Sequence, residues 1–90
     1  MNLVKKAIAG TLESSDIMVT VEPASTLTID LKSSVEKQFS ASIKSTVLAV
    51  AKRMNITGAN IILVDHGALD CTIRARLETA FLRAAKEGQA

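Results

Sequence analysis

The first third of the chain alternates between apolar and polar positions as expected of β-strands. Residues 7–12 and 17–22 are short, partly β-branched runs, and the polar residues Glu-Ser-Ser-Asp at 13–16 separate them. This arrangement predicts a hairpin with two serines at its tip. Pro23 lacks a backbone donor and ends the second strand, and residues 26–31 then alternate Thr and Asp with Leu and Ile. We expect a third, half-buried strand there.

The hydrophobic period changes after this third strand. Ser33 and Glu36 have the spacing of a capping box, in which the two side chains satisfy free amides at a helix N-terminus. Asn55 and Gly58 suit the end of that helix. Apolar residues recur between these signals at intervals of three and four, as Val35, Phe39, Ile43, Val47, Val50 and Met54. The pattern predicts one helix that buries this stripe.

The last third predicts one more strand and one more helix. Residues 59–64 form a short apolar run, which is typical of a strand inside a sheet and covered on at least one face. Asp70 then suits the first turn of a helix, because acids stabilise a helix N-terminus. The predicted buried face comprises Leu69, Ile73, Leu77, Phe81 and Ala84, and the predicted ion pairs are Arg74/Glu78 and Arg83/Glu87.

The predicted order is therefore three strands, a helix, a strand and a helix. Each helix has a single apolar stripe, and both stripes can be buried on one face of a sheet. We expect an α+β fold, a two-layer sandwich with a roughly four-stranded, mainly antiparallel sheet and both helices on one face. Ninety residues suffice for one such domain, which we place at 1–90.

Composition narrows the possible partners. Two Phe and no Tyr or Trp leave almost nothing for stacking bases, and the net charge of +2 is spread along the chain, so we expect no nucleic-acid partner. No apolar run approaches the roughly 20 residues that span a bilayer, so no membrane association is expected. The single cysteine and an N-terminus without a signal-peptide pattern predict a cytoplasmic protein.

The residues with reactive side chains are few. His66 and Cys71 are too few to hold zinc, so we expect no metal. They could form a nucleophilic pair, but Cys71 lies beside the apolar stripe, which favours a structural role. Capping accounts for Asp65 and Asp70. No glycine-rich phosphate loop is present, and catalysis by this chain alone has little support.

Two further sets of polar residues could have a function, the serine pair at the hairpin tip and three arginines of the last predicted helix. Serine is common at turns because its hydroxyl satisfies local amides, although Ser14 and Ser15 would also present a hydroxyl on a narrow protrusion, as a carrier protein requires. Arg74, Arg76 and Arg83 could form a basic patch that contacts a partner, or a solvated helix face.

Three segments together resemble one protein family. GTLESSD at 10–16, SSVEKQF at 33–39 and GALDCTIRARLE at 67–78 are similar to the citrate lyase acyl carrier proteins, and the resemblance extends from Ala7 to Ala85. The ordinary four-helix acyl carrier proteins differ, since they have an Asp-Ser-Leu sequence at a helix start and a strongly acidic surface.

The resemblance implies a covalently attached phosphoribosyl-dephospho-coenzyme A group. The group is bound through a phosphodiester to the serine that follows Gly-Thr-Leu-Glu, which is Ser14 here, with Ser15 as second candidate at a position where glycine or another small residue is expected. The resemblance also implies partners. The alpha subunit exchanges acetyl for citryl on the thiol of the group, the beta subunit cleaves the citryl thioester to oxaloacetate, and a transferase attaches the group. The carrier itself catalyses neither step.

Three alternatives stay open at this point. The chain could be the carrier of malonate decarboxylase, which uses the same type of group. It could be an unmodified protein-interaction module, or an independent enzyme that uses Cys71 and His66.

Overall fold

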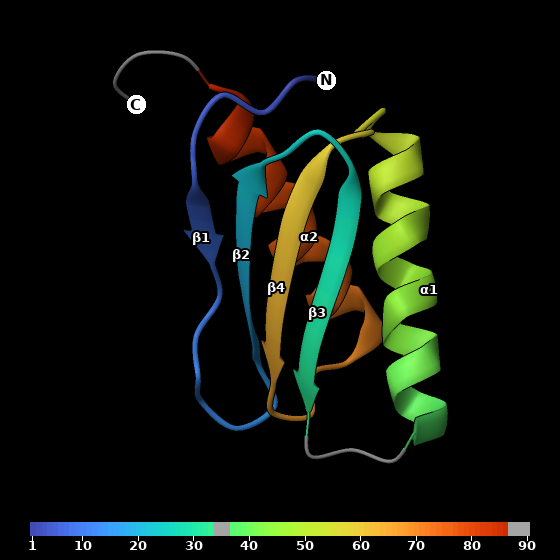
Figure 1. Cartoon of the computed structure of the whole chain (residues 1–90). Helices are drawn as coiled ribbons and strands as arrows, with labels where there is room; N and C mark the ends of the chain where they lie inside the picture. The colour runs from blue at the N-terminus through green and yellow to red at the C-terminus, as the bar shows by residue number, and fades with distance from the viewer. Residues whose placement is uncertain (34–36, 87–90) are drawn as a thin grey trace.

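The computed structural model describes residues 1–33 and 37–86. Four strands and two helices follow one another in the predicted order, three strands, a helix, a strand and a helix (Figure 1). Their bounds are β1 Ala7–Ala9, β2 Ile17–Pro23, β3 Leu27–Ser33, α1 Lys37–Arg53, β4 Ala59–Asp65 and α2 Asp70–Ala85. The first strand is shorter than predicted, because Gly10 has a φ of +89° that leaves the extended region.

The four strands form one mixed sheet in the order β1-β2-β4-β3. β2 pairs antiparallel with β1 and with β4, whereas β3 pairs parallel with β4, with Leu27 opposite Ala59. The predicted α+β class and the interior place of the fourth strand are confirmed, and two of the three strand pairs are antiparallel. The parallel pair arises because α1 carries the chain from the end of β3 back to the start of β4.

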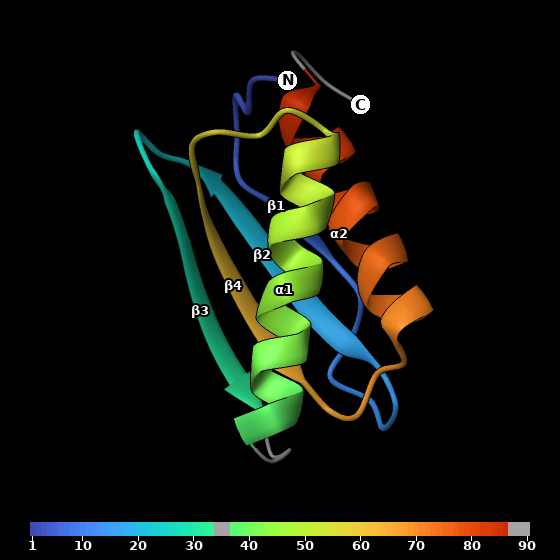
Figure 2. The same ribbon diagram turned by 90° about the vertical axis from the view of Figure 1, so that its right-hand side faces the viewer.

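Both helices cover the same face of the sheet (Figure 2). α2 packs on β1 and β2, and α1 packs against α2 and β3. One apolar core fills the space between the two layers, and its largest fully buried side chains are Phe81, Ile17, Ile61, Leu63, Leu77, Val19, Val21, Val47 and Val50. The alternate residues of β2 that point into this core are completely shielded from solvent, which sets the pairing register of the central strands.

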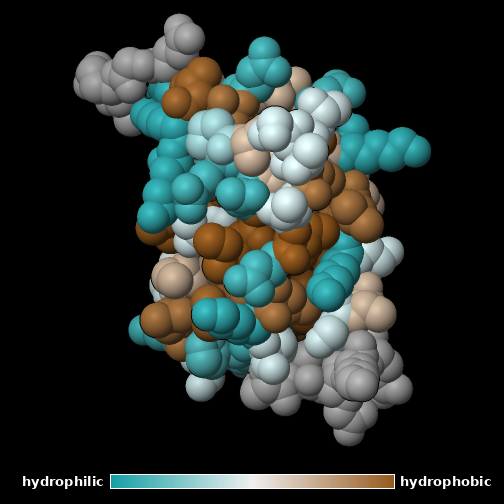
Figure 3. Space-filling model, in the orientation of Figure 1, coloured by the Kyte–Doolittle hydropathy of each residue, from teal (hydrophilic) through white to brown (hydrophobic). Residues whose placement is uncertain are grey.

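The other face of the sheet is open. In Figure 3 an apolar area crosses the middle of this face, with hydrophilic side chains around it. Ile8, Met18, Ile62 and Val64 alternate with the core residues of their strands, and Ile8 is 47% exposed. No helix in the described part of the chain is long and apolar enough to cross a membrane.

Two predicted core residues are not buried. Phe39 near the start of α1 is 54% exposed, and Leu69 just before α2 is 70% exposed. The other predicted positions within the described residues are confirmed, with Ile43, Val47, Val50, Ile73, Leu77, Phe81 and Ala84 buried and Met54 half-buried against the core. Val35, the first residue of the predicted stripe, lies outside the described residues. Helical spacing placed Phe39 and Leu69 on the correct face, but the two layers do not meet where these residues lie.

The predicted capping box falls partly outside the described residues. Ser33 is the last residue of β3, and its hydroxyl donates to Oδ2 of Asp65 at 3.0 Å. Glu36, the other member of the box, lies outside the described ranges. Ser33 therefore joins the end of one strand to the end of the next, a role that the sequence pattern did not predict.

Candidate functional site

The loop between β1 and β2 carries the two serines, and its backbone conformation is unusual at two positions. Gly10 has a φ of +89°, and a Cβ there would lie 1.8 Å from the carbonyl oxygen of Ile17, so only glycine fits. Ser15 has a φ of +64°, in the left-handed region that glycine also favours. A glycine would thus suit position 15, which matches the expectation from the family resemblance.

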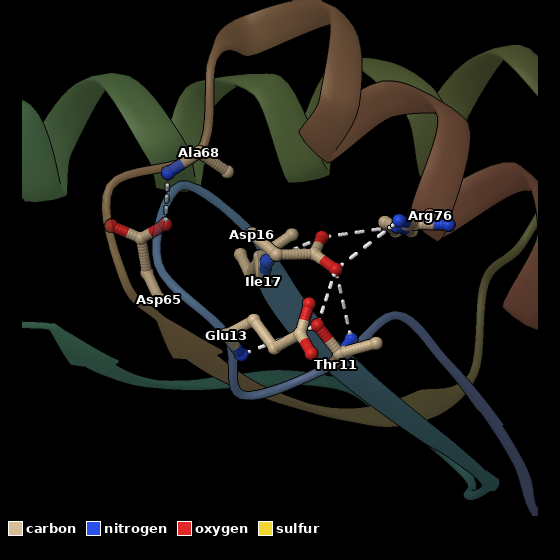
Figure 4. Close-up of polar contacts among 7 residues, drawn as sticks. All are labelled: Thr11, Glu13, Asp16, Ile17, Asp65, Ala68 and Arg76. Atoms are coloured by element: carbon tan, nitrogen blue, oxygen red, sulfur yellow. Dashed lines mark hydrogen bonds and ion pairs between the residues drawn. The ribbon is translucent and has the colours of Figure 1, made fainter.

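Asp16 organises the whole loop. Its Oδ2 accepts hydrogen bonds from the N–H and the hydroxyl of Thr11 at 3.1 and 2.6 Å, and its Oδ1 accepts the N–H of Ile17 at 2.8 Å. Arg76 of α2 donates from Nε to Oδ1 and from Nη2 to Oδ2, both at 3.1 Å (Figure 4). The Thr11 hydroxyl also accepts the N–H of Glu13 at 3.2 Å. One carboxylate therefore connects both ends of the loop to the last helix.

This bonding changes the acidity of Asp16. The hydroxyl of Thr11, the guanidinium of Arg76 and the N–H of Ile17 together lower the pKa of the Asp16 carboxyl well below its ordinary value. The bidentate contact with Arg76 is the charge-assisted part of this network. Asp16 thus stays ionised in mildly acidic solution and keeps the loop in one shape.

The loop is also bound to the connection between β4 and α2. The N–H of Ser15 donates to the carbonyl of His66 at 2.8 Å, and the N–H of His66 donates to the carbonyl of Asp16 at 2.9 Å. The backbone of residue 15 is thus fixed by a bond to a residue far away in the sequence. The side chains of both serines are exposed.

Ser14 is the less constrained of the two serines. Its hydroxyl is exposed and makes no hydrogen bond with any described residue. It belongs to a loop whose flanking residues are fixed on both sides, by Thr11 and Glu13 before it and by Ser15 and Asp16 after it. An exposed hydroxyl without an internal partner on an ordered loop can act as the acceptor of a transferred group.

A cavity of about 370 Å³ is lined in part by the β4–α2 connection, at residues 67–69. Most of its wall is apolar, formed by Phe39, Ile43, Ala68, Leu69 and Ile73. Asp65 lies in the wall and is 3% exposed; its Oδ1 accepts the N–H of Ala68 at 3.0 Å (Figure 4). The two predicted core residues that remain exposed therefore both line this cavity.

His66 and Cys71 do not form a site that the structure supports. Both side chains are exposed, and the contacts of His66 to the serine loop come from its backbone. Among residues 1–33 and 37–86, no three His, Cys, Asp or Glu side chains are grouped as a metal site requires. The capping role predicted for Asp70 is wrong, because Leu69 is the N-cap residue and Asp70 is the first residue of α2. The Asp70 carboxylate instead accepts the hydroxyl of Thr46 at 2.6 Å and the Nε of Arg74 at 2.7 Å, which lower the pKa of its carboxyl.

The three arginines of α2 each bind within the chain. Arg76 binds Asp16, Arg74 binds Asp70, and Nη1 of Arg83 donates to the carbonyl of Ile8 at 2.7 Å. The predicted Arg74/Glu78 pair is wrong, since Glu78 pairs with Arg53 of α1 and Arg74 turns one helical turn back instead. Glu87, of the other predicted pair, lies outside the described residues. Only the exposed parts of these three side chains are therefore left to form the basic patch that the sequence suggested.

Comparison with known proteins gives consistent matches over the chain. Residues 4–84 match the family model described as the malonate decarboxylase delta subunit. A citrate lyase acyl carrier protein from Yersinia enterocolitica is 51% identical over 97% of this chain and 92% of its own length. One from Haemophilus ducreyi is 48% identical and covers all of this chain, with 95% of the relative covered.

A solved structure shares the fold. The crystal structure of a Pseudomonas malonate decarboxylase hetero-tetramer in complex with malonate contains a chain that superposes with a TM-score of 0.69. The match covers 93% of this chain and 92% of that one, at 24% sequence identity. The same two-layer arrangement therefore occurs in a chain with a quite different sequence.

Proposed function

We propose that Ser14 carries the prosthetic group of this protein, because the chain belongs to the family of citrate lyase acyl carrier proteins. The malonate decarboxylase family model matches the chain as well. The resemblance inferred from the three sequence segments is confirmed by relatives about half identical over the whole chain. The protein is an acyl carrier subunit, and malonate decarboxylase is the alternative complex. Names of the relatives favour citrate lyase, because the structural match to malonate decarboxylase shares only 24% of its residues.

One observation supports Ser14 more than any other. Its hydroxyl, like that of Ser15, is exposed and without a partner among the described residues, but Ser14 is free of the left-handed φ and of the backbone bond to His66 that hold Ser15. An ordered loop with an unengaged hydroxyl suits group transfer, because a partner enzyme then meets one preformed geometry.

We propose phosphoribosyl-dephospho-coenzyme A as the group. Attachment would form a bond between Oγ of Ser14 and a phosphorus atom of the activated group. The hydroxyl proton would pass to a base of the transferase, the phosphoanhydride bond of the activated donor would break at that phosphorus, and the phosphate or pyrophosphate beyond this bond would depart. When bound, the group supplies a thiol that holds acetyl or citryl as a thioester. This chain supplies the fixed loop, a narrow and accessible attachment point, and a tether that raises the local concentration of the thioester at the partner subunits.

We propose the alpha and beta subunits of citrate lyase and the attaching transferase as partners, in the cytoplasm. The relatives support a carrier within a complex of several subunits. The alternative of an independent enzyme finds no support in the exposed positions of His66 and Cys71. The names of the relatives favour a carrier over an unmodified interaction module.

Intact mass spectrometry tests the attachment site. The protein is produced together with its transferase as wild type, as Ser14→Ala and as Ser15→Gly. We expect a mass increase of one whole group in the wild type and in Ser15→Gly, and complete loss of the increase in Ser14→Ala. Glycine is the matched control because it suits the φ of +64° at position 15 and so leaves the loop intact.

An adduct that persists in Ser14→Ala and disappears in Ser15→Gly would move the site to Ser15. If wild-type protein never gains mass beside an active transferase, the carrier role itself is wrong.

A further inference from the structure

The cavity beside the serine loop is large enough to bind a small molecule. Its volume of about 370 Å³ lies within the range of roughly 300–1,000 Å³ that is common for ligand sites. We propose that this cavity binds the pantetheine end of the arm carried by Ser14, and so shields the thiol between reactions. This inference rests on the proposed function, since Ser14 must carry the arm.

The position of the cavity favours the arm as its occupant. Ser15, the neighbour of Ser14, donates its N–H to the carbonyl of His66 at 2.8 Å. The next three residues of that connection, at 67–69, line the cavity. The neighbour of the attachment point is thus held by a backbone hydrogen bond to the residue that directly precedes this stretch of the cavity wall, so a long flexible arm that leaves Ser14 starts one connection away from the cavity.

The chemistry of the wall selects one part of the arm. Pantetheine is uncharged and carries two amide N–H groups, a pair of methyl groups and a thiol. Phe39 and Leu69 leave apolar surface exposed at the opening, and Ile43 and Ile73 form buried parts of the wall. Such surface favours the methyl and methylene groups of pantetheine, since its burial from water is favourable.

Asp65 supplies a polar contact in this apolar wall. Among the described residues, one of its oxygens accepts a hydrogen bond from the Ser33 hydroxyl and the other accepts one from the N–H of Ala68. A carboxylate has about four acceptor positions, so it can also accept an amide N–H of pantetheine. The carboxylate of Asp65, which has no cationic partner among the described residues, disfavours phosphate and so disfavours the nucleotide end of the arm. The same repulsion disfavours a citryl group, so we expect the free thiol and the acetyl form to bind.

A tether makes even weak binding sufficient. A short flexible link gives an effective concentration in the millimolar range. A cavity with an intrinsic Kd of about 1 mM for pantetheine would therefore be occupied about half of the time when the arm is attached. The thiol would then be shielded often enough to slow its reactions, yet would leave readily for a partner.

Titration of the unmodified protein with free pantetheine tests the cavity without any attachment. We expect the methyl NMR signals of Ile43 and Ile73 to shift, with those of Ile29 on β3 unchanged. Ser42 lines the cavity and is exposed, so Ser42→Trp should fill it and abolish the shifts. Ser45→Trp is the matched control, because Ser45 is exposed on the same helix and is not part of the cavity wall.

Reactivity of the arm thiol tests the loaded protein. Cys71 is the only cysteine, so a Cys71→Ser background leaves the arm thiol as the only thiol. We expect a maleimide to react with this thiol about twofold more slowly than with free pantetheine. Ser42→Trp should restore the free rate, and Ser45→Trp should not.

The outcomes separate the two proposals. Intact mass reports whether Ser14 is loaded, whereas the pantetheine titration reports on the cavity in every case. Shifts that vanish in Ser42→Trp and persist in Ser45→Trp support the inference, even if attachment occurs elsewhere. Absent shifts at about 10 mM pantetheine, roughly ten times the expected Kd, would overturn it.

Discussion

The core and the serine loop are ordered by different kinds of interaction, although both depend on α2. Phe81 and Leu77 of this helix are completely buried, and their contribution is spread over many apolar contacts. Arg76, on the same helix, is exposed enough to reach Asp16, and the loop depends on that carboxylate and on two backbone hydrogen bonds to His66. Because the core and the loop depend on different interactions, a substitution in the core can lower the stability of the protein and leave the geometry of the loop unchanged. A substitution in the loop can disturb that geometry while the protein stays folded.

Removing the centre of the core should give the largest effect on stability. Phe81→Ala deletes a fully buried aromatic ring and should lower the free energy of unfolding by about 3–5 kcal/mol, measured by urea denaturation. The control is Leu82→Ala, at the next position and 55% exposed, which should change it by less than about 1 kcal/mol. Folded Phe81→Ala protein should still be loaded at Ser14. Loss of loading at temperatures where this variant is folded would contradict the idea that the core and the loop are ordered independently.

Two glycines separate strain from steric clash. Gly10 and Gly67 have φ values of +89° and +91°, but a Cβ at Gly10 meets the Ile17 carbonyl at 1.8 Å and one at Gly67 meets nothing within 4 Å. Gly67→Ala should therefore cost about 1–2 kcal/mol from its backbone conformation alone. Gly10→Ala should cost clearly more in thermal or urea denaturation and also disturb the loop. Equal costs would show that the clash is relieved by movement of the backbone.

Acid should release the loop only at very low pH. The folded pKa of Asp16 lies below its unfolded value of about 3.9, so the stabilisation by its carboxylate is fully present above that pH. It is lost as the pH falls through the folded pKa. We expect the amide NMR signals of Thr11 and Ile17 to keep their positions down to about pH 3. In Asp16→Asn they should start from other positions and show no such titration; a midpoint near pH 4 in the wild type would contradict the network.

The smallest effect on stability is expected at Arg74. Its ion pair with Asp70 is exposed on both sides, so Arg74→Glu should change the unfolding free energy by about 0.5 kcal/mol or less. If the exposed part of α2 contacts a partner, the same change should weaken assembly with the alpha and beta subunits in size-exclusion chromatography. Lys44→Glu, with the same change of charge on α1, is the control. Unchanged assembly would remove α2 as a contact surface.

The order and type of the elements followed from the sequence because each stripe repeats with its own period. The strand pairing could not be predicted in this way. No local pattern in Ala59–Asp65 indicates that this strand lies between β2 and β3 or that it runs parallel to one of them. Phe39 and Leu69 were assigned to the core because periodicity assumes that a helix is covered over its whole length. Their exposure is informative, since both line the cavity.

The serine loop could be located from its turn residues, but the contacts that fix the loop to the rest of the protein could not be predicted. Asp16 and Arg76 are 60 positions apart, and no spacing rule connects a loop to a helix over that distance. One signal was present in the sequence: position 15 is where the family resemblance led us to expect glycine or another small residue, and the structure shows a positive φ there.

The long separation of Asp16 and Arg76 has a consequence for the order of events during synthesis. The loop is made early, but its carboxylate finds its partner only when α2, the last helix, has been made and packed. We expect an incomplete or misfolded chain to present Ser14 in a different geometry, so that the transferase modifies finished molecules. Loading of a urea-unfolded chain as fast as the folded one, by a transferase that tolerates the urea, would remove this form of quality control.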